Sequence, residues 1–221
     1  MRRSFVVLVF GLLFSLSTHA ARGADKVVLV AGGSSDEGGP ATEAKLIGPF
    51  GVDFDRSGNT FLVEIAGHRV LKIDRQGVLT RVAGTGMKGD RGDEGPALKA
   101  EFNAMHSLAV LPSGDIFVAD TLNNRVRKID PRAGTITAFA GTGKKGDSGD
   151  GGPAAQAEFG GIYCVALDPK GERLVLTDLD NRRIRVVDLA TGIVTTAAGN
   201  GAKGKPADGA DARNSQLVDP R

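Results

Sequence analysis

Short runs of apolar and β-branched residues recur along the chain after its first twenty residues. In the middle of the chain, turn-forming proline, glycine and asparagine residues separate these runs. Runs bounded in this way are typical of short β-strands. No long helical pattern follows residue 20, so we expect an all-β chain. In this stretch the expected strands are Leu108–Leu111, Ile116–Asp120, Val126–Asp130 and Thr135–Ala140.

The same four-strand pattern occurs three times, at offsets of 56 and then 57–58 residues. Self-similarity at a period of this size indicates stacked structural units. Four antiparallel strands per repeat is the plan of a propeller blade. The three expected blades occupy residues of about 51–83, 108–140 and 164–198.

The repeat motifs also resemble those of a known family. The residues that carry this resemblance are Gly51–Asn59, Val118–Thr121, Asn123–Lys128 and the connector Ala140–Ala154. Over residues 26–221 the chain resembles the NHL-repeat family. The resemblance implies an all-β fold, namely a β-propeller of four-stranded antiparallel blades, with about three blades present as part of a six-bladed ring. It does not specify function, because propellers host binding modules and enzymes alike.

Both ends of the repeat region suggest an incomplete ring. Residues 26–31 match the fourth strand of the later copies, so we expect a fourth strand there that lacks its first three. The segment Ser215–Arg221 matches the residues just before a first strand. Three blades are too few for the usual ring of four to eight. We therefore expect a truncated sequence, with missing blades or an assembly partner needed to close the ring.

Residues 1–20 have the three parts of a secretory signal peptide. Arg2 and Arg3 precede an apolar run from Phe5 to Leu16, and small residues lead to Ala20. We expect export, hence a secreted or periplasmic protein; an uncleaved anchor and a twin-arginine signal are the alternatives. The apolar run is shorter than the roughly 20 residues that span a bilayer, and no membrane span is expected after signal removal.

The charge balance argues against nucleic acid as a partner. The formal net charge is +2, and both excess charges are Arg2 and Arg3 in the expected signal. The remaining chain is neutral, whereas affinity for a phosphate backbone depends on the cations placed against it.

A charged pair recurs after the second strand of each copy. An acid precedes an arginine by five residues, and the two are expected to face each other across the turn and to form a charge-assisted pair. Because the pairs recur in every copy, we interpret them as structural. They are Glu64 with Arg69, Asp120 with Arg125, and Asp178 with Arg183; Gly67, Asn123 and Asn181 are the expected left-handed turn residues.

The connectors between copies are rich in glycine and acids. Each fits G-x-G-x-x-G, but without the following helix that dinucleotide binding needs, so we expect no cofactor. The connector acids Asp90, Asp93, Asp147 and Asp150 are mixed with lysines, and we interpret them as solvated turn residues rather than calcium ligands. A short helical turn is expected after Pro96 and Pro153.

The residues just before the first strands differ between copies although their neighbours repeat. They are Phe50, His106, Tyr163 and Arg221. In a propeller they would ring the mouth of the central channel, on the same face as the connectors. Variable side chains on a repeated frame suit ligand selection, here of a polar ligand with a flat or anionic part. Packing against neighbouring blades is the alternative interpretation.

These observations favour a non-enzymatic recognition module that binds a protein, peptide or glycan on the connector face. No catalytic set, metal site or cofactor is assembled by the sequence, and the single cysteine, Cys164, is expected to be a small buried residue. The alternative is a metal-dependent hydrolase or lyase, with His106 as a metal ligand at the channel mouth. RNA binding, known among NHL propellers, is opposed by the neutral chain and the export signal.

Overall fold

The computed structural model describes residues 29–34 and 37–221, so the expected signal peptide at residues 1–20 lies outside the described residues. Three antiparallel sheets follow one another along the chain, each with four strands that are neighbours in chain order, and the two-residue strand β5 (Gly95–Pro96) adds a fifth strand to the second sheet. The four-stranded antiparallel blades expected from the sequence are confirmed. The first sheet contains β1 (Pro49–Phe54), β2 (Thr60–Glu64), β3 (Val70–Ile73) and β4 (Leu79–Ala83).

The second and third sheets repeat this plan. The second contains β6 (Met105–Val110), β7 (Ile116–Asp120), β8 (Arg125–Asp130) and β9 (Thr135–Ala140). The third contains β10 (Ile162–Leu167), β11 (Arg173–Asp178), β12 (Arg183–Asp188) and β13 (Val194–Ala198). The first strands begin two or three residues earlier than the sequence pattern indicates, and this places the residues of the expected channel mouth inside them.

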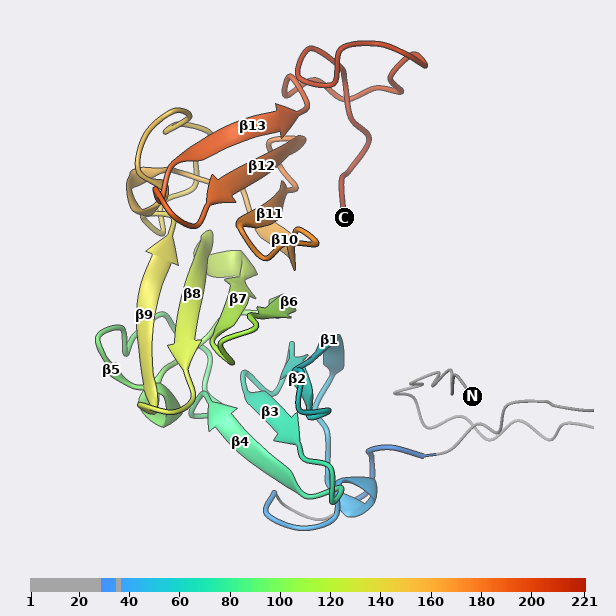
Figure 1. The fold of residues 1–221 in the computed structure, drawn as a ribbon, viewed down its shortest axis with the longest axis vertical. Coiled ribbons are helices and arrows are strands. Elements are labelled where there is room, and N and C mark those ends of the chain that lie inside the picture. Colours follow the sequence, from blue (N-terminus) through green and yellow to red (C-terminus); the bar gives the residue numbers. More distant parts are fainter. Residues whose placement is uncertain (1–28, 35–36) are drawn as a thin grey trace, which may run out of the picture.

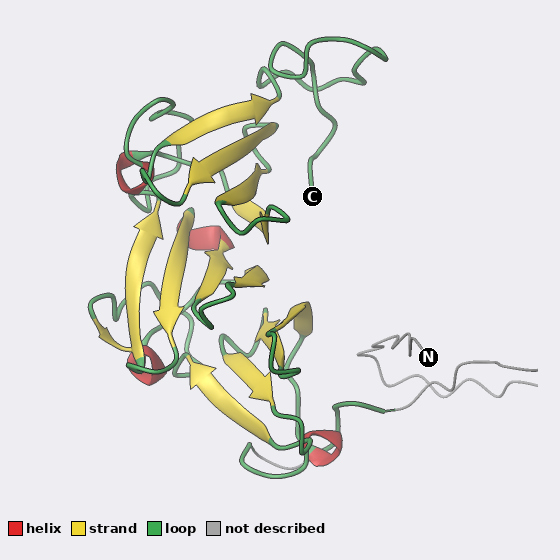
Figure 2. Ribbon diagram, viewed as in Figure 1, coloured by secondary structure: helices red, strands yellow, loops and turns green. Residues whose placement is uncertain are grey.

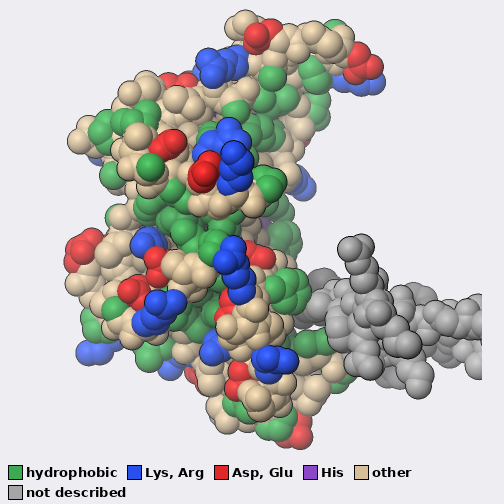
Figure 3. Space-filling view, in the orientation of Figure 1, with side chains coloured by type: hydrophobic (Ala, Val, Ile, Leu, Met, Phe, Trp, Pro, Cys, Tyr) green, Lys and Arg blue, Asp and Glu red, His purple; other side chains and the backbone are tan. Residues whose placement is uncertain are grey.

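The three sheets form an arc, with β1, β6 and β10 on its concave side and β4, β9 and β13 on its outer side (Figure 1). In the part of the chain that the structure describes, helical structure is limited to short 3-10 turns (Figure 2). On the face shown in Figure 3, basic and acidic side chains are interspersed. Among the described residues, no helix is long and apolar enough to cross a membrane.

Apolar side chains fill the boundaries between sheets. Phe61 and Val63 on β2 pack with Leu108 and Val118 of the second sheet. On the other side of the second sheet, Phe117 packs in a cluster shared with the third sheet. Burying one such side chain contributes about 1.5–3 kcal/mol, so the inter-sheet boundaries hold the arc together.

The outer edge of each sheet is covered by the connector that precedes it. The short strand β5 (Gly95–Pro96) pairs with β9. Pro40 and Pro153 form equivalent bridges to Val78 and Ile193. Unpaired strand edges promote association between chains, and these prolines occupy the edges with residues of the same chain.

The expected helical turns after the connector prolines are present as 3-10 turns. They are η1 (Ala41–Glu43), η2 (Ala97–Lys99) and η4 (Ala154–Gln156), and their first alanines are buried. The connector after the third sheet has Asp211 in place of the proline. It nevertheless keeps the repeat's hydrogen bonds, because Gly199 N–H donates to Ala212 O as Gly141 N–H does to Ala154 O.

The expected strand at 26–31 is only partly within the described residues, and there it is not a strand. Residues 29–31 pair with no described strand. Ala31 is instead buried in a cluster with Leu62 and Leu71, on the side of the first sheet that faces away from the second. The segment therefore covers this side of the sheet with side chains and not through a backbone ladder.

The inner strands of neighbouring sheets approach closely and are linked by side chains. Asp53 Oδ2 accepts a hydrogen bond of 2.8 Å from Val110 N–H. Ser107 Oγ lies 3.2 Å from both N and O of Val165. At Gly51 a Cβ atom would lie 2.7 Å from His106 O. Only glycine therefore allows β1 and β6 to meet at this point.

We predict that Gly51→Ala lowers the free energy of unfolding by about 1–3 kcal/mol, because the added methyl overpacks the junction of two backbones. Urea denaturation checks this. The matched control is Gly39→Ala: no atom lies within 4 Å of its added Cβ and its φ is outside the left-handed region, so a change within about 0.5 kcal/mol is expected. Equal losses in the two variants would contradict the close approach of the inner strands.

Candidate functional site

The innermost strand of each sheet carries a bulge near its start. The register shifts between Pro49 and Val52, between Met105 and Ser107, and between Ile162 and Val165. The bulged positions include Phe50, His106 and Tyr163, which therefore have no cross-strand partner. A bulge bends its strand and re-aims a side chain, and here it frees one side chain per sheet from the ladder.

These side chains meet one another. The rings of Phe50 and His106 are edge to face with centroids 5.2 Å apart, and those of Phe50 and Tyr163 are 6.0 Å apart. His106 and Tyr163 are tilted at 4.4 Å, and Arg221 Cζ lies 5.5 Å from the Tyr163 ring centroid. The four residues predicted from the repeat thus form one cluster, called the mouth cluster below. It packs across three sheets and stays accessible, since Phe50 is 50% exposed.

His106 is held in one orientation within the mouth cluster. Its Nδ1 lies 2.9 Å from Ala104 O and 3.0 Å from Thr121 Oγ1. A carbonyl oxygen only accepts, so in the neutral ring Nδ1 carries the proton and Nε2 keeps its lone pair. Burial lowers the pKa of His106 below its usual 6.5, and the Arg221 charge lowers it further. At neutral pH this imidazole therefore presents an acceptor atom, Nε2.

Three of the four mouth residues, Phe50, His106 and Tyr163, are positioned by a buried carboxylate on the second strand of their sheet. Glu64, Asp120 and Asp178 are completely buried. Each accepts a hydrogen bond from the backbone N–H three residues before the mouth residue. The donors are Ile47 at 2.6 Å, Asn103 at 2.8 Å and Gly160 at 2.7 Å. The end of each connector is thereby tied to the middle of its sheet.

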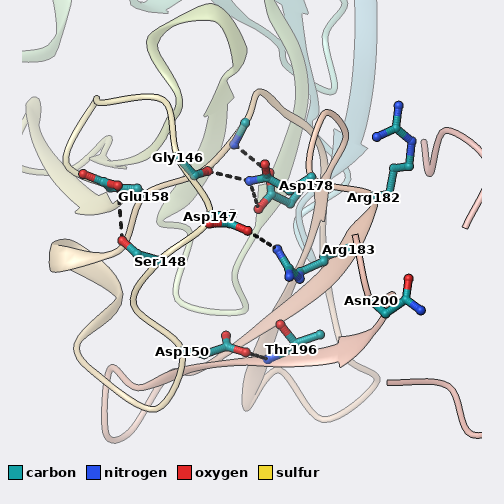
Figure 4. Close-up of polar contacts among 12 residues, drawn as sticks. Gly146, Asp147, Ser148, Asp150, Glu158, Asp178, Arg182, Arg183, Thr196 and Asn200 are labelled. Carbon is teal, nitrogen blue, oxygen red and sulfur yellow. Dashed lines mark hydrogen bonds and ion pairs between the residues drawn. The ribbon is translucent and has the colours of Figure 1, made fainter. Parts of the chain in front are cut away.

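Two of the three predicted turn pairs are present. Arg69 Nε lies 2.7 Å from Glu64 Oε2, and Arg125 Nε lies 3.7 Å from Asp120 Oδ2. The third predicted pair, Asp178 with Arg183, is wrong. Arg183 pairs instead with the carboxylate of Asp147 on the connector, at 2.8 Å (Figure 4).

The carboxylate of Asp178 has other partners. It accepts two hydrogen bonds from the Asn181 side chain and lies 3.5 Å from Arg185 Nη1. With its oxygens occupied in this way, Asp178 leaves Arg183 to the connector.

The left-handed residue of each turn lies one position later than predicted. Positive φ values occur at His68, Asn124 and Arg182. Asn123 instead donates its side-chain amide to Gly89 O of the connector at 2.8 Å and to Asp120 at 2.9 Å. In the first sheet the longer Glu64 side chain fills this space, since a Cβ on Gly67 would lie 2.2 Å from Glu64 Oε2. The longer acid, Glu64, is thus combined with a glycine at position 67, and the shorter acid, Asp120, with an asparagine at position 123.

Two buried arginines of this network were not predicted. Arg127 and Arg185 are completely buried, and their guanidinium groups lie 4.9 and 5.2 Å from the ring centroids of Phe102 and Phe159. The only sequence clue is their recurrence seven residues after the buried acid.

The buried arginines reach the connector acids, which are therefore not simply solvated. Arg127 Nε lies 2.8 Å from Asp93 Oδ1, and Arg185 Nη2 lies 2.8 Å from Asp150 Oδ1. Asp150 Oδ2 also accepts a hydrogen bond of 3.1 Å from Thr196 N–H (Figure 4). The connectors are fastened to the third and fourth strands through these carboxylates.

The first sheet achieves the same connection with different residues. Leu71 occupies the position of Arg127, and its cross-strand partner is Arg81, whereas the partner of Arg127 is Ala138. The guanidinium has thus moved to the paired position on the fourth strand. From there, Arg81 Nε lies 3.3 Å from Glu37 Oε1 of its own connector.

Burial dominates the titration of this network. It raises the pKa of Asp120 to about 6, although the Asn103 N–H, the Asn123 amide and the Arg127 charge act in the opposite direction. Burial also raises the pKa of Asp178. The free-energy cost of desolvating a buried ion pair commonly exceeds the attraction between its two charges. These carboxylates therefore fix the positions of the connectors more than they stabilise the fold.

A metal site requires several ligating side chains that lie close together. Within residues 29–34 and 37–221, no group of three His, Cys, Asp or Glu side chains is placed to hold a metal ion. Cys164 is half-buried, with its Sγ 3.7 Å from Ser107 Oγ. Together with the mouth cluster, the described residues offer recognition chemistry: rings, one acceptor nitrogen and one guanidinium.

Sheets of four antiparallel strands arranged around a centre, with the first strand innermost, define a β-propeller type of protein. The fold is similar to that of a Bacteroides thetaiotaomicron protein of unknown function, with a TM-score of 0.62 at 16% identity over 78% of this chain and 40% of that chain. An auxiliary nutrient binding protein from the same organism gives a TM-score of 0.59 at 16% identity over 86% and 49%. At such identities the likeness concerns the fold alone.

Sequence comparisons add the family. The NHL repeat family model matches residues 102–129. NHL repeat-containing protein 2 of Gallus gallus is 31% identical over 114 residues, which cover 51% of this chain and 15% of that protein. SUPPRESSOR OF QUENCHING 1, a chloroplastic protein of Arabidopsis thaliana, is 34% identical over 95 residues, 42% of this chain and 9% of that protein. Residues 102–129 thus match an NHL repeat, and the chain spans only a small part of the length of these relatives.

We predict that Asp120→Asn changes the pH dependence of stability. The folded pKa of about 6 is above the ordinary 3.8, so the wild-type carboxyl favours the folded state at low pH and loses this contribution as pH rises from about 4 to 6. The loss amounts to about 3 kcal/mol at 1.36 kcal/mol per pKa unit.

Urea denaturation of wild type and variant at pH 4 and pH 7 measures this contribution. The stability of the wild type relative to the variant should be lower at pH 7 than at pH 4. The same difference at both pH values would show that Asp120 titrates normally.

Proposed function

We propose that this chain is a recognition module that binds a protein, peptide or glycan at the mouth cluster on the connector face. The observation that carries the proposal is the convergence of four dissimilar side chains from equivalent positions of the repeat. The rings of Phe50, His106 and Tyr163 lie within 6.0 Å of one another, and the Arg221 guanidinium lies 5.5 Å from the Tyr163 ring centroid. Rigid aromatic groups and arginine are the residue types that dominate binding energy at recognition sites.

The frame beneath the mouth cluster supports this assignment. The buried carboxylates, the connector ends and the bulges are the same in all three sheets, while the bulged side chain differs each time. A change at a bulged position alters the surface offered to a ligand without disturbing the ladder. Such separation between a constant scaffold and variable side chains is typical of binding sites built on repeats.

Export belongs to the proposal as well. It rests on the composition of residues 1–20, which resembles a secretory signal. The ligand would then be an extracellular or periplasmic molecule.

A metal-dependent hydrolase or lyase is the second candidate, and one observation favours it. Histidines that bind metal commonly donate their other ring N–H to a backbone carbonyl, as His106 does to Ala104. Elemental analysis of the purified chain, before and after equilibration with Zn²⁺, tests this candidate. Stoichiometric metal that is lost in His106→Ala would support it, and metal-free protein would end it.

For the recognition module, we predict that Phe50→Ala reduces ligand binding at least tenfold, because it removes the exposed ring that packs against His106 and Tyr163. Glycan and peptide arrays identify a bound molecule, and fluorescence anisotropy with that molecule measures the affinity. Phe54→Ala is the matched control: Phe50 and Phe54 lie on the same strand and are 50% and 53% exposed.

Affinity unchanged in Phe50→Ala, or reduced equally in Phe54→Ala, would place binding away from the mouth. In either case the proposed function would lose the observation that carries it.

A further inference from the structure

Within the mouth cluster, His106 and Arg221 offer two different polar contacts. Nε2 of His106 accepts a hydrogen bond, since Nδ1 is engaged with Ala104 O and Thr121 Oγ1. Arg221 supplies only donors and a positive charge. Both side chains border the Tyr163 ring, with the His106 ring centroid at 4.4 Å and Arg221 Cζ at 5.5 Å from its centroid, so a ligand lying across this ring would face both.

The two contacts define a ligand with an anionic group beside a hydrogen-bond donor. A guanidinium matches the planar, bidentate geometry of a carboxylate. The neutral imidazole requires a donor, which a hydroxyl group provides and a carboxylate does not. The rings of Phe50 and Tyr163 complete the site with an apolar surface against which a carbon skeleton packs.

The backbone at His106 adds an independent observation. Ala104 has φ of 56°, and the equivalent residues Gly48, Gly161 and Asp219 have φ of 66°, 79° and 42°. A left-handed alanine is strained by about 1 kcal/mol or more, and residues held in such conformations cluster at functional sites. The carbonyl of this strained residue is the one that fixes the His106 tautomer. The fold therefore fixes the orientation of the His106 ring and of its acceptor atom, Nε2.

We infer that the mouth cluster binds a hydroxycarboxylate, with the carboxylate on Arg221, a neighbouring hydroxyl donating to Nε2 of His106, and the carbon skeleton against Phe50 and Tyr163. This inference rests on the proposed function and specifies its ligand. An acidic sugar such as a uronic acid has this chemistry, and so does a small hydroxy acid. The sugar ring has the larger apolar face for the two aromatic rings.

NMR titration of the full chain tests the inference, with D-glucuronate, D-glucose and L-lactate as probes. The chain has three histidines, of which His68 lies in the turn between β2 and β3, outside the mouth cluster, and serves as an internal reference. D-glucuronate should shift the His106 Cε1–H signal and leave His68 in place. Its affinity should exceed that of D-glucose, which lacks the carboxylate, at least tenfold. If L-lactate equals D-glucuronate, the hydroxycarboxylate chemistry stands and its source is a small acid.

Two substitutions of His106 separate its roles. His106→Asn keeps an N–H for Ala104 O but removes the acceptor at the Nε2 position, so D-glucuronate binding should fall about tenfold with the melting temperature unchanged. His106→Gln places an amide oxygen near the Nε2 position and should restore part of the affinity. Arg221→Gln should abolish the preference for D-glucuronate over D-glucose.

The inference is overturned if D-glucuronate leaves the His106 signal unmoved, or if both His106 variants bind it as the wild type does. The proposed function fails separately. If an array ligand still depends on Phe50 while D-glucuronate and L-lactate do not bind, the recognition module stands and only the ligand class is wrong.

Discussion

The hydrogen bond from a connector N–H to a fully buried carboxylate is the interaction on which the site depends. It occurs once per sheet, at Glu64, Asp120 and Asp178, with lengths of 2.6–2.8 Å. Through it the end of each long connector is anchored to the middle of a sheet, three residues before a mouth residue. The inner strand then starts from a defined point, and its bulge turns one side chain toward the centre.

This anchor is maintained at an energetic cost, and the surrounding arginines offset it. Burial alone would favour a protonated acid, as the raised pKa of Asp120 shows. Removing one partner of such a network leaves an unpaired buried charge and is strongly destabilising. The first sheet shows that the position of the charge matters more than the strand that supplies it, because Arg81 acts from the fourth strand where Arg127 acts from the third.

Local pattern and repetition were sufficient to predict the four-stranded sheets, the connector turns and the convergence of Phe50, His106, Tyr163 and Arg221. The errors concern contacts between segments distant in the chain. Arg183 faces Asp178 in the strand register, yet its guanidinium reaches Asp147 on a connector 36 residues away. The buried Arg127 was missed because an arginine in a strand normally indicates a solvent-facing position, and its stacking on Phe102 becomes visible only when the connector is folded back.

The mouth residues differ in how firmly the fold holds them. Phe50 is half exposed and touches its neighbours through ring edges, so other side chains of similar size would fit there. His106 is held by two oxygens on Nδ1, one of them from a residue in a strained conformation. Strain of this kind persists only where the surroundings over-determine it. A ring that merely filled space would not need a fixed tautomer, whereas a directional contact with a ligand does.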